Sequence, residues 1–229
     1  MFTPARRRGI EILDDPGVDA AVRTRSIGDV TRSNRWLGGL RAAIGELLRV
    51  LPSLESDAIL LDVGTGLADI PRHGMSAAAA NGTRLVTIGV DLSWALLAAA
   101  RDHTSHMVCA DARALPFRDQ SVDVVMCSQF LHHFEDPDAE HVVRELDRVA
   151  RRAVVVSDLR RSWIAAAGFW LVSFPLRFHR VTRHDGVVSV MRGFTPSELR
   201  RIIRLATGTA ATVSRRPGFR LTARWVRTT

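Results

Sequence analysis

Between residues 59 and 157 the sequence alternates short apolar runs, rich in β-branched residues, with longer amphipathic runs. Apolar runs at 59–63, 85–90, 106–109, 122–127 and 153–157 have the length and composition of buried strands. Segments at 68–80, 94–102 and 137–150 have the spacing of helices. Because strands that alternate with helices are joined by crossover connections, the pattern predicts an α/β fold with a mostly parallel sheet and helices on both faces.

The flanking segments are expected to add helices and a hairpin. Residues 18–50 predict one or two helices with a break at the adjacent glycines 38 and 39, and 163–178 predicts an apolar helix. Residues 184–186 are expected in a turn before an extended segment at 187–191. A capped helix starting at Thr195 and a closing hairpin over 210–226 complete the expected fold.

Arginine supplies all 32 basic residues, since the chain has no lysine, and 24 acidic residues leave a formal net charge of +8. This balance is compatible with an anionic partner. Arg6, Arg7 and Arg8 form a run, whereas the other arginines are scattered or paired. We therefore expect solvated arginines and no nucleic-acid partner.

We expect a cytoplasmic protein without stable membrane insertion. The N-terminal MFTPARRRGIEILDD has no apolar segment of the kind found in signal peptides. The apolar stretch at 163–178 is interrupted by Gly168, Pro175 and Arg177, and it is shorter than the ~20 residues that a membrane span requires.

The first predicted strand runs into DVGTGLAD at 62–69, where an acid and a glycine turn precede a helix. Gly64 and Gly66 would let the backbone pass close to a ligand, and the helix start offers free N–H groups. A third glycine at position 69 would complete a dinucleotide fingerprint, but Asp69 stands there. The pattern argues against a pyrophosphate at this turn.

Further acids accompany the next strands. Asp91 ends the second strand in GVDLS, Asp111 follows the third in CADARALPF, and Asp123 lies at the fourth. An ionised acid after the second strand can accept from both hydroxyls of a ribose. Because open α/β sheets bind ligands along their carboxyl edge, we expect these acids and Asp62 along that edge.

These segments, followed by SVDVVMCSQFLHHFEDPD at 121–138, resemble in order the motifs of class I S-adenosylmethionine-dependent methyltransferases. The resemblance covers about residues 60–159. It implies a Rossmann-like sheet of seven mostly parallel strands, the last of them antiparallel. It also implies S-adenosylmethionine as the cofactor and S-adenosylhomocysteine as the product.

Motif positions imply the cofactor contacts. Gly64 and Gly66 would lie under the methionine part, and Asp62 would shape the turn or meet the amino group through water. Asp91 would hold the ribose, and Asp111 with Ala112 would border the adenine. The complete set expected to bind the cofactor is Arg35, Asp62, Gly64, Thr65, Gly66, Asp91, Leu92, Asp111, Ala112, Ser128 and Gln129.

Two histidines, His132 and His133, follow the fourth strand. An oxygen acceptor loses its proton as the methyl group transfers, and imidazole suits that work. The segment resembles natural-product O-methyltransferases in which such a pair faces the acceptor together with an acid after the fifth strand, here Asp158. We expect these three residues to be catalytic, with His132 ahead of His133.

A metal site is the alternative for this segment. Gln129, His132 and His133 match positions where some quinone-pathway O-methyltransferases carry two acids and a histidine. Glutamine replaces a carboxylate poorly, and hard divalent cations prefer oxygen ligands. We therefore expect no metal.

The apolar stretch at 163–178 lies where this family carries a variable acceptor cap. Its aromatic side chains are expected to cover a pocket for a hydrophobic ring or chain, with Trp163 and Trp170 as acceptor contacts. His184 is expected to reach the same pocket. A core helix or a dimer contact is the alternative, and both a monomer and a homodimer remain open.

The segments EILDDP, NRWLGG, SDLRRS and RHDG resemble small bacterial methyltransferases encoded beside type III polyketide synthases. This resemblance implies a phenolic or quinonoid acceptor, and a role for Arg35 and the glycines at 38 and 39 in closing the cofactor pocket. We expect one domain. Its parts are an N-terminal helical extension at 1–56, a cofactor-binding core at 57–159, an acceptor cap at 160–194 and a C-terminal helix and hairpin at 195–229.

The expected activity is therefore methyl transfer to an oxygen of a hydrophobic small molecule. The alternatives are C-methylation of a quinone-type ring, RNA methylation, and a protein that keeps the fold without turnover. The run after the fourth strand lacks the Pro-Pro-aromatic motif of base-amino methylation, and Cys127 lacks a preceding proline. Both features argue against a nucleic-acid base as the acceptor.

Overall fold

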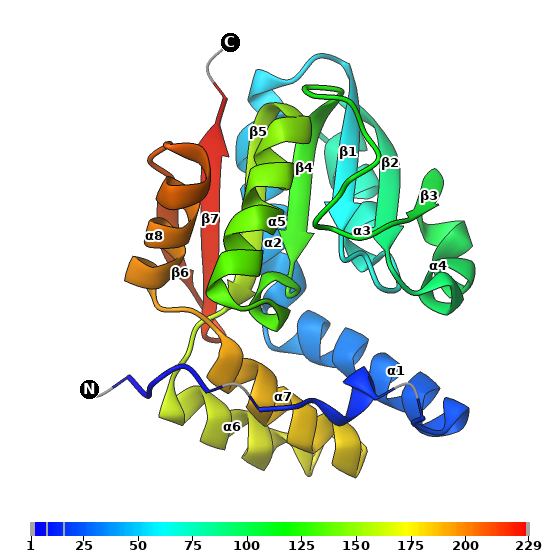
Figure 1. Ribbon diagram of the computed structural model, residues 1–229. Helices are drawn as coiled ribbons and strands as arrows, with labels where there is room; N and C mark the ends of the chain where they lie inside the picture. The colour runs from blue at the N-terminus through cyan, green and yellow to red at the C-terminus, as the bar shows by residue number, and fades with distance from the viewer. Residues whose placement is uncertain (1–2, 8, 16, 228–229) are drawn as a thin grey trace.

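The computed structural model describes residues 3–7, 9–15 and 17–227, so Arg8 and Pro16 of the segments discussed above lie outside the described residues. The strands are β1 (Asp57–Val63), β2 (Arg84–Asp91), β3 (His106–Cys109), β4 (Val122–Ser128), β5 (Ala150–Leu159), β6 (Thr212–Arg216) and β7 (Arg220–Val226). They form a seven-stranded sheet in the order β3-β2-β1-β4-β5-β7-β6 (Figure 1). Strands β1 to β5 are parallel, and β7 is antiparallel to both neighbours, which confirms the predicted sheet.

Helices cover both faces of this sheet. Helices α2 (Gly39–Val50) and α3 (Asp69–Ala79) pack on one face, α5 (Asp136–Val149) and α8 (Pro196–Thr207) pack on the other, and α4 (Trp94–Ala100) lies against β2 and β3. The predicted capping box begins α8, where Glu198 N–H donates to the Thr195 hydroxyl at 3.2 Å and Thr195 N–H donates to the Glu198 carboxylate at 2.8 Å. Within the described ranges, no helix is long and apolar enough to cross a membrane.

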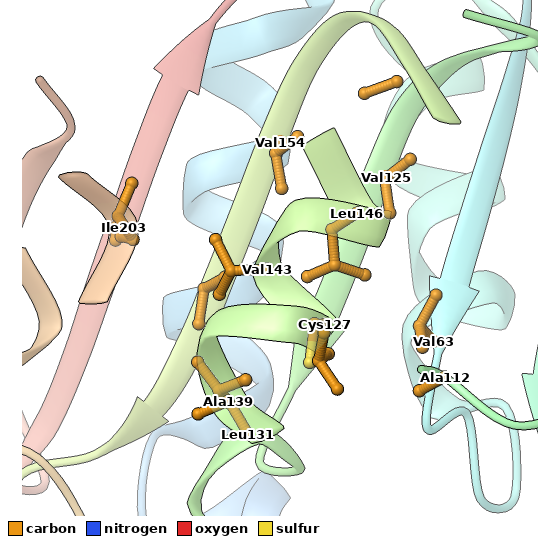
Figure 2. Close-up of a cluster of buried hydrophobic side chains, with 14 of the residues drawn as sticks. Val63, Ala112, Val125, Cys127, Leu131, Ala139, Val143, Leu146, Val154 and Ile203 are labelled. Atoms are coloured by element: carbon orange, nitrogen blue, oxygen red, sulfur yellow. The ribbon is translucent and has the colours of Figure 1, made fainter. Parts of the chain in front are cut away.

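Alternate residues of the central strands enter two cores. Val154 of β5 and Val125 of β4 point toward α5, where they belong to one buried cluster with Leu146 (Figure 2). Val155 of β5 joins Leu47 of α2 on the opposite face. Because both faces are covered, the strand sequences are continuously apolar instead of alternating, which is why their positions could be predicted.

Three further helices, α1 (Ala20–Trp36), α6 (Trp163–Ser173) and α7 (Arg180–Arg192), lie beyond the carboxyl ends of the parallel strands (Figure 1). The buried Asp29 ties α1 to α7, because one carboxylate oxygen accepts from His179 N–H at 2.7 Å and from the Thr182 hydroxyl at 3.1 Å. The expected break between α1 and α2 occurs at Gly38, which has a φ of +83°. Short 3-10 turns are η1 (Ile12–Asp14), η2 (Leu51–Ser53), η3 (Arg101–His103) and η4 (Leu131–His133).

The turn expected at 184–186 and the extended segment expected at 187–191 are wrong, because all these residues lie inside α7. Gly186 permits close packing of α6 on α7, since a Cβ at this position would lie 2.0 Å from Cε1 of Phe169. This tertiary contact outweighs the strand preference of the valine-rich segment. Helix α6 also ends at Ser173, before the expected end at residue 178.

The N-terminal segment crosses the cap helices and lies beside α7 (Figure 1). The Asp185 carboxylate accepts from the N–H groups of Ile12 at 2.8 Å and Leu13 at 2.9 Å. Arg6 donates to Asp136 at 2.6 Å and to the carbonyl of Phe134 at 3.0 Å. These bonds hold residues far apart in the sequence at one end of the sheet.

Candidate functional site

The glycine turn after β1 adopts the expected conformation. Gly64 and Gly66 have φ values of +73° and +54°, which side-chain-bearing residues rarely adopt. The N–H groups of Gly64 and Thr65 both donate to the Val90 carbonyl at 2.9 Å, which joins the turn to β2. A Cβ at Gly64 would lie 2.3 Å from Cγ of Phe130, so only glycine fits under this ring.

Asp62 is buried at the end of β1 and lines a cavity. One carboxylate oxygen accepts from the Thr65 hydroxyl at 2.8 Å, and Oδ1 has no hydrogen-bond partner among the described residues. Burial, with the nearby Asp91 and Asp69 charges, raises the pKa of Asp62 to about 7. A buried oxygen without a partner is costly, so it fits a bound donor such as the ammonium group of S-adenosylmethionine.

The other predicted acids take different positions. Asp91 ends β2, and its carboxylate accepts from Gly66 N–H at 3.0 Å and Ser93 N–H at 2.9 Å. Asp111 follows β3 and pairs with Arg113 at 2.7 Å, which lowers the pKa of this exposed carboxyl. The expectation for Asp123 is wrong. It lies at the start of β4, at the opposite edge of the sheet, where it accepts from Ile59 N–H at 2.9 Å.

Leu92 and Ala112 follow these acids but do not line the cavity. Leu92 is 70% exposed, and Ala112 is buried in the core beside α5. The chain after β3 approaches β2 through a bond from Ala110 N–H to the Asp91 carbonyl at 3.2 Å. The expected ribose and adenine residues therefore lie on neighbouring strand ends along one edge.

The cavity has a volume of about 330 Å³ and lies between the carboxyl edge of the sheet and the cap. Of the predicted cofactor residues, its wall contains Asp62, Gly64, Thr65, Gly66, Ser128 and Gln129. Both predicted histidines also line it. The N-terminal segment, α1, α2, α6 and α7 contribute apolar side chains, namely Leu13, Ile27, Val30, Leu40, Phe169 and Val190. Charged and polar side chains also line the cavity, among them Glu11, Asp14, Asn34, Asp69, Asp185, Ser189 and Arg220.

His132 and Asp158 form a buried pair at this cavity. The ring Nδ1 of His132 lies 2.6 Å from Oδ1 of Asp158, and the backbone N–H of His132 donates to Oδ2 at 3.0 Å. Burial opposes ionisation of Asp158, but the His132 ring and the N–H of Leu159 hold its pKa below the ordinary value. Nε2 of His132 is buried and has no partner in the described part of the chain. The pair thus presents one free ring nitrogen, as a general base requires.

His133 lies beside His132, with ring centroids 4.4 Å apart. About a third of its side chain is exposed, yet burial of the ring, the His132 ring and the Arg192 charge lower its pKa well below the ordinary value. His133 is therefore neutral at pH 7. Its backbone N–H bonds to the Phe130 carbonyl at 3.1 Å, which closes the turn that holds both rings.

Glu11, which the sequence interpretation missed, lies close to both rings. It is 6% exposed, and burial raises its pKa. The carboxylate accepts from Ser189 at 2.7 Å and pairs with Arg192 at 3.2 Å. Glu11 lies in the segment EILDDP, but no local pattern connects that segment with histidines more than 100 residues later.

One ligand atom each of Glu11, His132 and His133 lies within 4.8 Å of the others, so these three residues could approach a metal ion. This set differs from the Gln129, His132 and His133 set considered from the sequence. Arg192 already neutralises the Glu11 carboxylate, and a cation at that distance would repel a metal ion. The expectation of no metal stays a prediction.

The expected acceptor contacts on the cap differ from the side chains that line the cavity. Trp163 and Trp170 are 49% and 48% exposed and lie outside its wall, whereas Phe169, between them on α6, is part of it. His184 pairs with Asp185 at 2.8 Å and also lies outside the wall. The helical turn of α6 and α7 rotates these three side chains away from the cavity.

Arg35 does not line this cavity. It borders a second hollow with Trp36, Arg41 and Arg216, so the structure does not place it in the wall of the cavity that it was expected to help close. The arginine in the main cavity is Arg220, at the start of β7. Its position could not be read from the sequence, where it follows the hairpin turn among five arginines between 215 and 227.

Residues 61–156 match the methyltransferase domain family. A stretch of 93 residues is 33% identical to the malonyl-[acyl-carrier protein] O-methyltransferase of Marinomonas sp. (strain MWYL1). This match covers 38% of the present chain and 33% of that protein, so it spans about a third of the length of this curated relative.

Solved structures share the fold at low sequence identity. The plantazolicin methyltransferase BpumL in complex with SAH has a TM-score of 0.67 and 11% identity, over 95% of this chain and 93% of that chain. Magnesium protoporphyrin IX methyltransferase (ChlM) from Synechocystis PCC 6803 with bound SAM has a TM-score of 0.57 and 13% identity, over 95% and 89% of the two chains. Both likenesses cover more of the chain than the matched domain at 61–156 does.

Proposed function

The chain contains a class I S-adenosylmethionine-dependent methyltransferase domain, and from this premise we propose that it methylates an oxygen of a hydrophobic small molecule. The acceptor we propose is a phenolic or quinonoid polyketide-type compound. The observation that carries the proposal is the buried His132–Asp158 pair, because Nε2 of His132 has no partner among the described residues and His132 lines a cavity whose wall includes apolar side chains.

Several residues of the chain are suited to hold the cofactor. The turn of Gly64 and Gly66 brings backbone close to the cavity, and Asp62 offers an oxygen that lacks a partner in the described ranges. Asp91 retains lone pairs for the ribose hydroxyls, because a carboxylate can accept more than two hydrogen bonds. Bound S-adenosylmethionine supplies an electrophilic methyl group.

His132 acts on the acceptor as a general base. Asp158 accepts the Nδ1 proton, which fixes the tautomer with its lone pair on Nε2. The acceptor oxygen would give its proton to Nε2 as it takes the methyl group, whose bond to the cofactor sulfur would break and leave S-adenosylhomocysteine. Asp158 then stabilises the resulting imidazolium. Neutral His133 beside it adds no positive charge that would oppose this protonation.

The cavity wall supports an apolar acceptor. Phe169 and Val190 of the cap line the same cavity as Ile27 and Val30 of α1. Burying a ring or alkyl chain there removes apolar surface from water, which contributes about 25 cal/mol per Å². Exclusion of water also protects the proton transfer to His132.

The proposal is tested by incubating the protein with labelled S-adenosylmethionine and simple alkylphenols, quinones or mixed RNA. We expect labelled phenol ether, identified by the chemical shift of an O-methyl group. A carbon-bound methyl group would establish C-methylation of the ring instead. Labelling of RNA would establish an RNA substrate if the labelling rate falls steeply between low and moderate salt, because contacts with phosphates are salt-sensitive.

A further inference from the structure

Two arginines in the described part of the chain have almost completely buried side chains, and they differ in one respect. Arg161 is 5% exposed and pairs with Glu198 at 2.6 Å. Arg220 is 3% exposed and forms no direct ion pair with a carboxylate of the described residues, although the Asp158 charge acts on it from farther away and raises its pKa. Its neighbour on the hairpin, Arg216, pairs with Glu46. A buried charge without a directly paired counter-ion is costly, so the burial of Arg220 requires an explanation.

The contacts of Arg220 leave part of its guanidinium free. Nη1 donates to Oε1 of Gln129 at 2.5 Å, and Nε donates to the Leu37 carbonyl at 3.4 Å. A guanidinium has five N–H donors, and these bonds use two of them. Burial lowers the pKa of Arg220 to about 10, so the group is still cationic at neutral pH. The free donors belong to a residue of the main cavity wall.

Arg220 and Asp62 lie on the same side of the sheet. Thr222, two residues after Arg220 on β7, bonds to Glu46 of α2, so Arg220 also faces the α2 layer. Asp62 follows Leu60 on the same face of β1, where Leu60 packs with the α2 cluster. The side chain of Asp158 on β5 lies on the opposite face of the sheet, away from α2. One side of the cavity thus carries an acid and a cation, and the other carries the base.

The buried cation and the buried carboxylate both have hydrogen-bonding positions without a partner. Together they are suited to bind a zwitterion, which carries one positive and one negative charge. We propose that Arg220 is the carboxylate-binding residue of this cavity and that it holds the α-carboxylate of S-adenosylmethionine. Gln129, in the left-handed region at a φ of +52°, positions the guanidinium through its side chain. This inference concerns the cofactor and does not depend on which acceptor is methylated.

The test compares three ligands by calorimetry on the full chain. S-adenosylhomocysteine carries the carboxylate, its decarboxylated analogue keeps only the amine, and methylthioadenosine lacks both groups. For Arg220→Gln we expect a loss of about tenfold to hundredfold in affinity for S-adenosylhomocysteine, the scale of hydrogen bonds between charged groups. Affinities for the other two ligands should change less than threefold. Arg215→Gln, an exposed arginine of the same hairpin, is the matched control.

Other outcomes overturn the proposal. Equal losses for all three ligands would mean that Arg220 only maintains the fold. An unchanged affinity of Arg220→Gln for S-adenosylhomocysteine would mean that Arg220 does not bind the cofactor carboxylate. Arg220 would then bind a carboxylate of the acceptor, and the variant would show a raised KM for the acceptor. The melting temperature without ligand should not fall, because the variant removes an unpaired buried charge. If Arg220→Gln does not fold, the same three ligands are compared on Arg220→Lys and on the wild-type protein. Equal affinity of the wild-type protein for S-adenosylhomocysteine and for its decarboxylated analogue would exclude a carboxylate site.

Discussion

Asp158 holds His132 through two hydrogen bonds, one from the ring Nδ1 at 2.6 Å and one from the backbone N–H at 3.0 Å. Each carboxylate oxygen therefore fixes a different part of the histidine. The side chain cannot rotate without losing the first bond, and the main chain cannot shift without losing the second. Nε2 is consequently the one ring nitrogen left for chemistry.

Replacing Asp158 with asparagine should impair the base while preserving the site. The amide can present its NH2 group to Nδ1, which favours the tautomer that carries its proton on Nε2. Turnover should fall by about 10²–10⁴, as when a general base is lost. Single-turnover rates measure the loss, and calorimetry should give nearly unchanged affinity for S-adenosylhomocysteine. Exposed Asp138→Asn is the control, and equal rates for the two variants would contradict the assignment.

Asp62 should make cofactor binding depend on pH. Burial and the Asp91 and Asp69 charges raise its pKa to about 7, so the carboxyl is increasingly protonated below pH 7. A bound ammonium group favours the ionised form. Affinity for S-adenosylhomocysteine should therefore rise as pH increases from about 5 to 7 and level off above that. Calorimetry across this range checks the trend, and Asp62→Asn should abolish it.

The same shift predicts how stability changes with pH. The folded protein keeps the Asp62 proton up to about pH 7, whereas the unfolded chain loses it near the ordinary value of 3.8. Between these values the folded state binds more protons, so the Asp62 contribution to the free energy of unfolding falls as pH rises. Denaturant titrations should show a flatter dependence for Asp62→Asn. An identical dependence in the variant would mean that Asp62 ionises normally.

Local patterns predicted where the turn after β1 and the acid at the end of β2 lie, because these residues follow directly from strand ends. Asp62 and Gly64 occupy the turn after β1, and Asp91 ends β2, so predicting the strands also placed these residues. Asp123 was misplaced for the same reason, since it begins a strand instead of ending one. The order of strands and acids along the sequence thus predicts which residues lie at the carboxyl edge of the sheet.

The acceptor half depends on contacts between distant segments, which no local pattern encodes. Glu11 reaches His132 because the Asp185 carboxylate holds the N-terminal segment through Ile12 and Leu13. Residues 187–191 of helix α7 are predicted as an extended segment from the sequence, because valines favour strands unless packing decides otherwise. On α6, Phe169 packs against Gly186 of that helix, whereas Trp163 is exposed.

Gly64→Ala should disrupt the cofactor turn beyond the cost of its backbone conformation. An alanine at a φ of +73° is strained, and its Cβ would also overlap the Phe130 ring. Gly82 is the control, since its φ is +78° but no atom lies within 4 Å of an added Cβ. Gly82→Ala should cost about 1–2 kcal/mol of unfolding free energy. Gly64→Ala should cost more and weaken S-adenosylhomocysteine binding, whereas equal effects in denaturant titrations would contradict the packing argument.

Metal chelation should leave turnover unchanged. Glu11 approaches both histidines, but Arg192 at 3.2 Å and Ser189 at 2.7 Å already satisfy its carboxylate. Dialysis against a chelator, followed by metal analysis and rate measurement, checks this expectation. Loss of activity that returns on addition of a divalent cation would show that the cluster is a metal site.

The last prediction separates the two histidines. His132→Ala removes the free nitrogen beside Asp158 and should lower turnover by about 10²–10⁴, while affinity for S-adenosylhomocysteine stays nearly constant. His133→Ala should have a smaller effect, because His133 has no carboxylate within ordinary hydrogen-bond distance and its nearest acid, Asp14, is 3.9 Å away. His141→Ala, an exposed histidine on α5, is the control.

An acidic phenol changes the size of these effects but not their order. A fraction of such an acceptor arrives already ionised and needs no base. The loss of turnover in His132→Ala therefore shrinks toward the lower end of the range. A series of phenols of falling acidity should then show a growing penalty for His132→Ala and a constant one for His133→Ala. If neither variant loses even tenfold with any of these acceptors, orientation and exclusion of water carry the transfer, and the Asp158 pair maintains the structure of the turn.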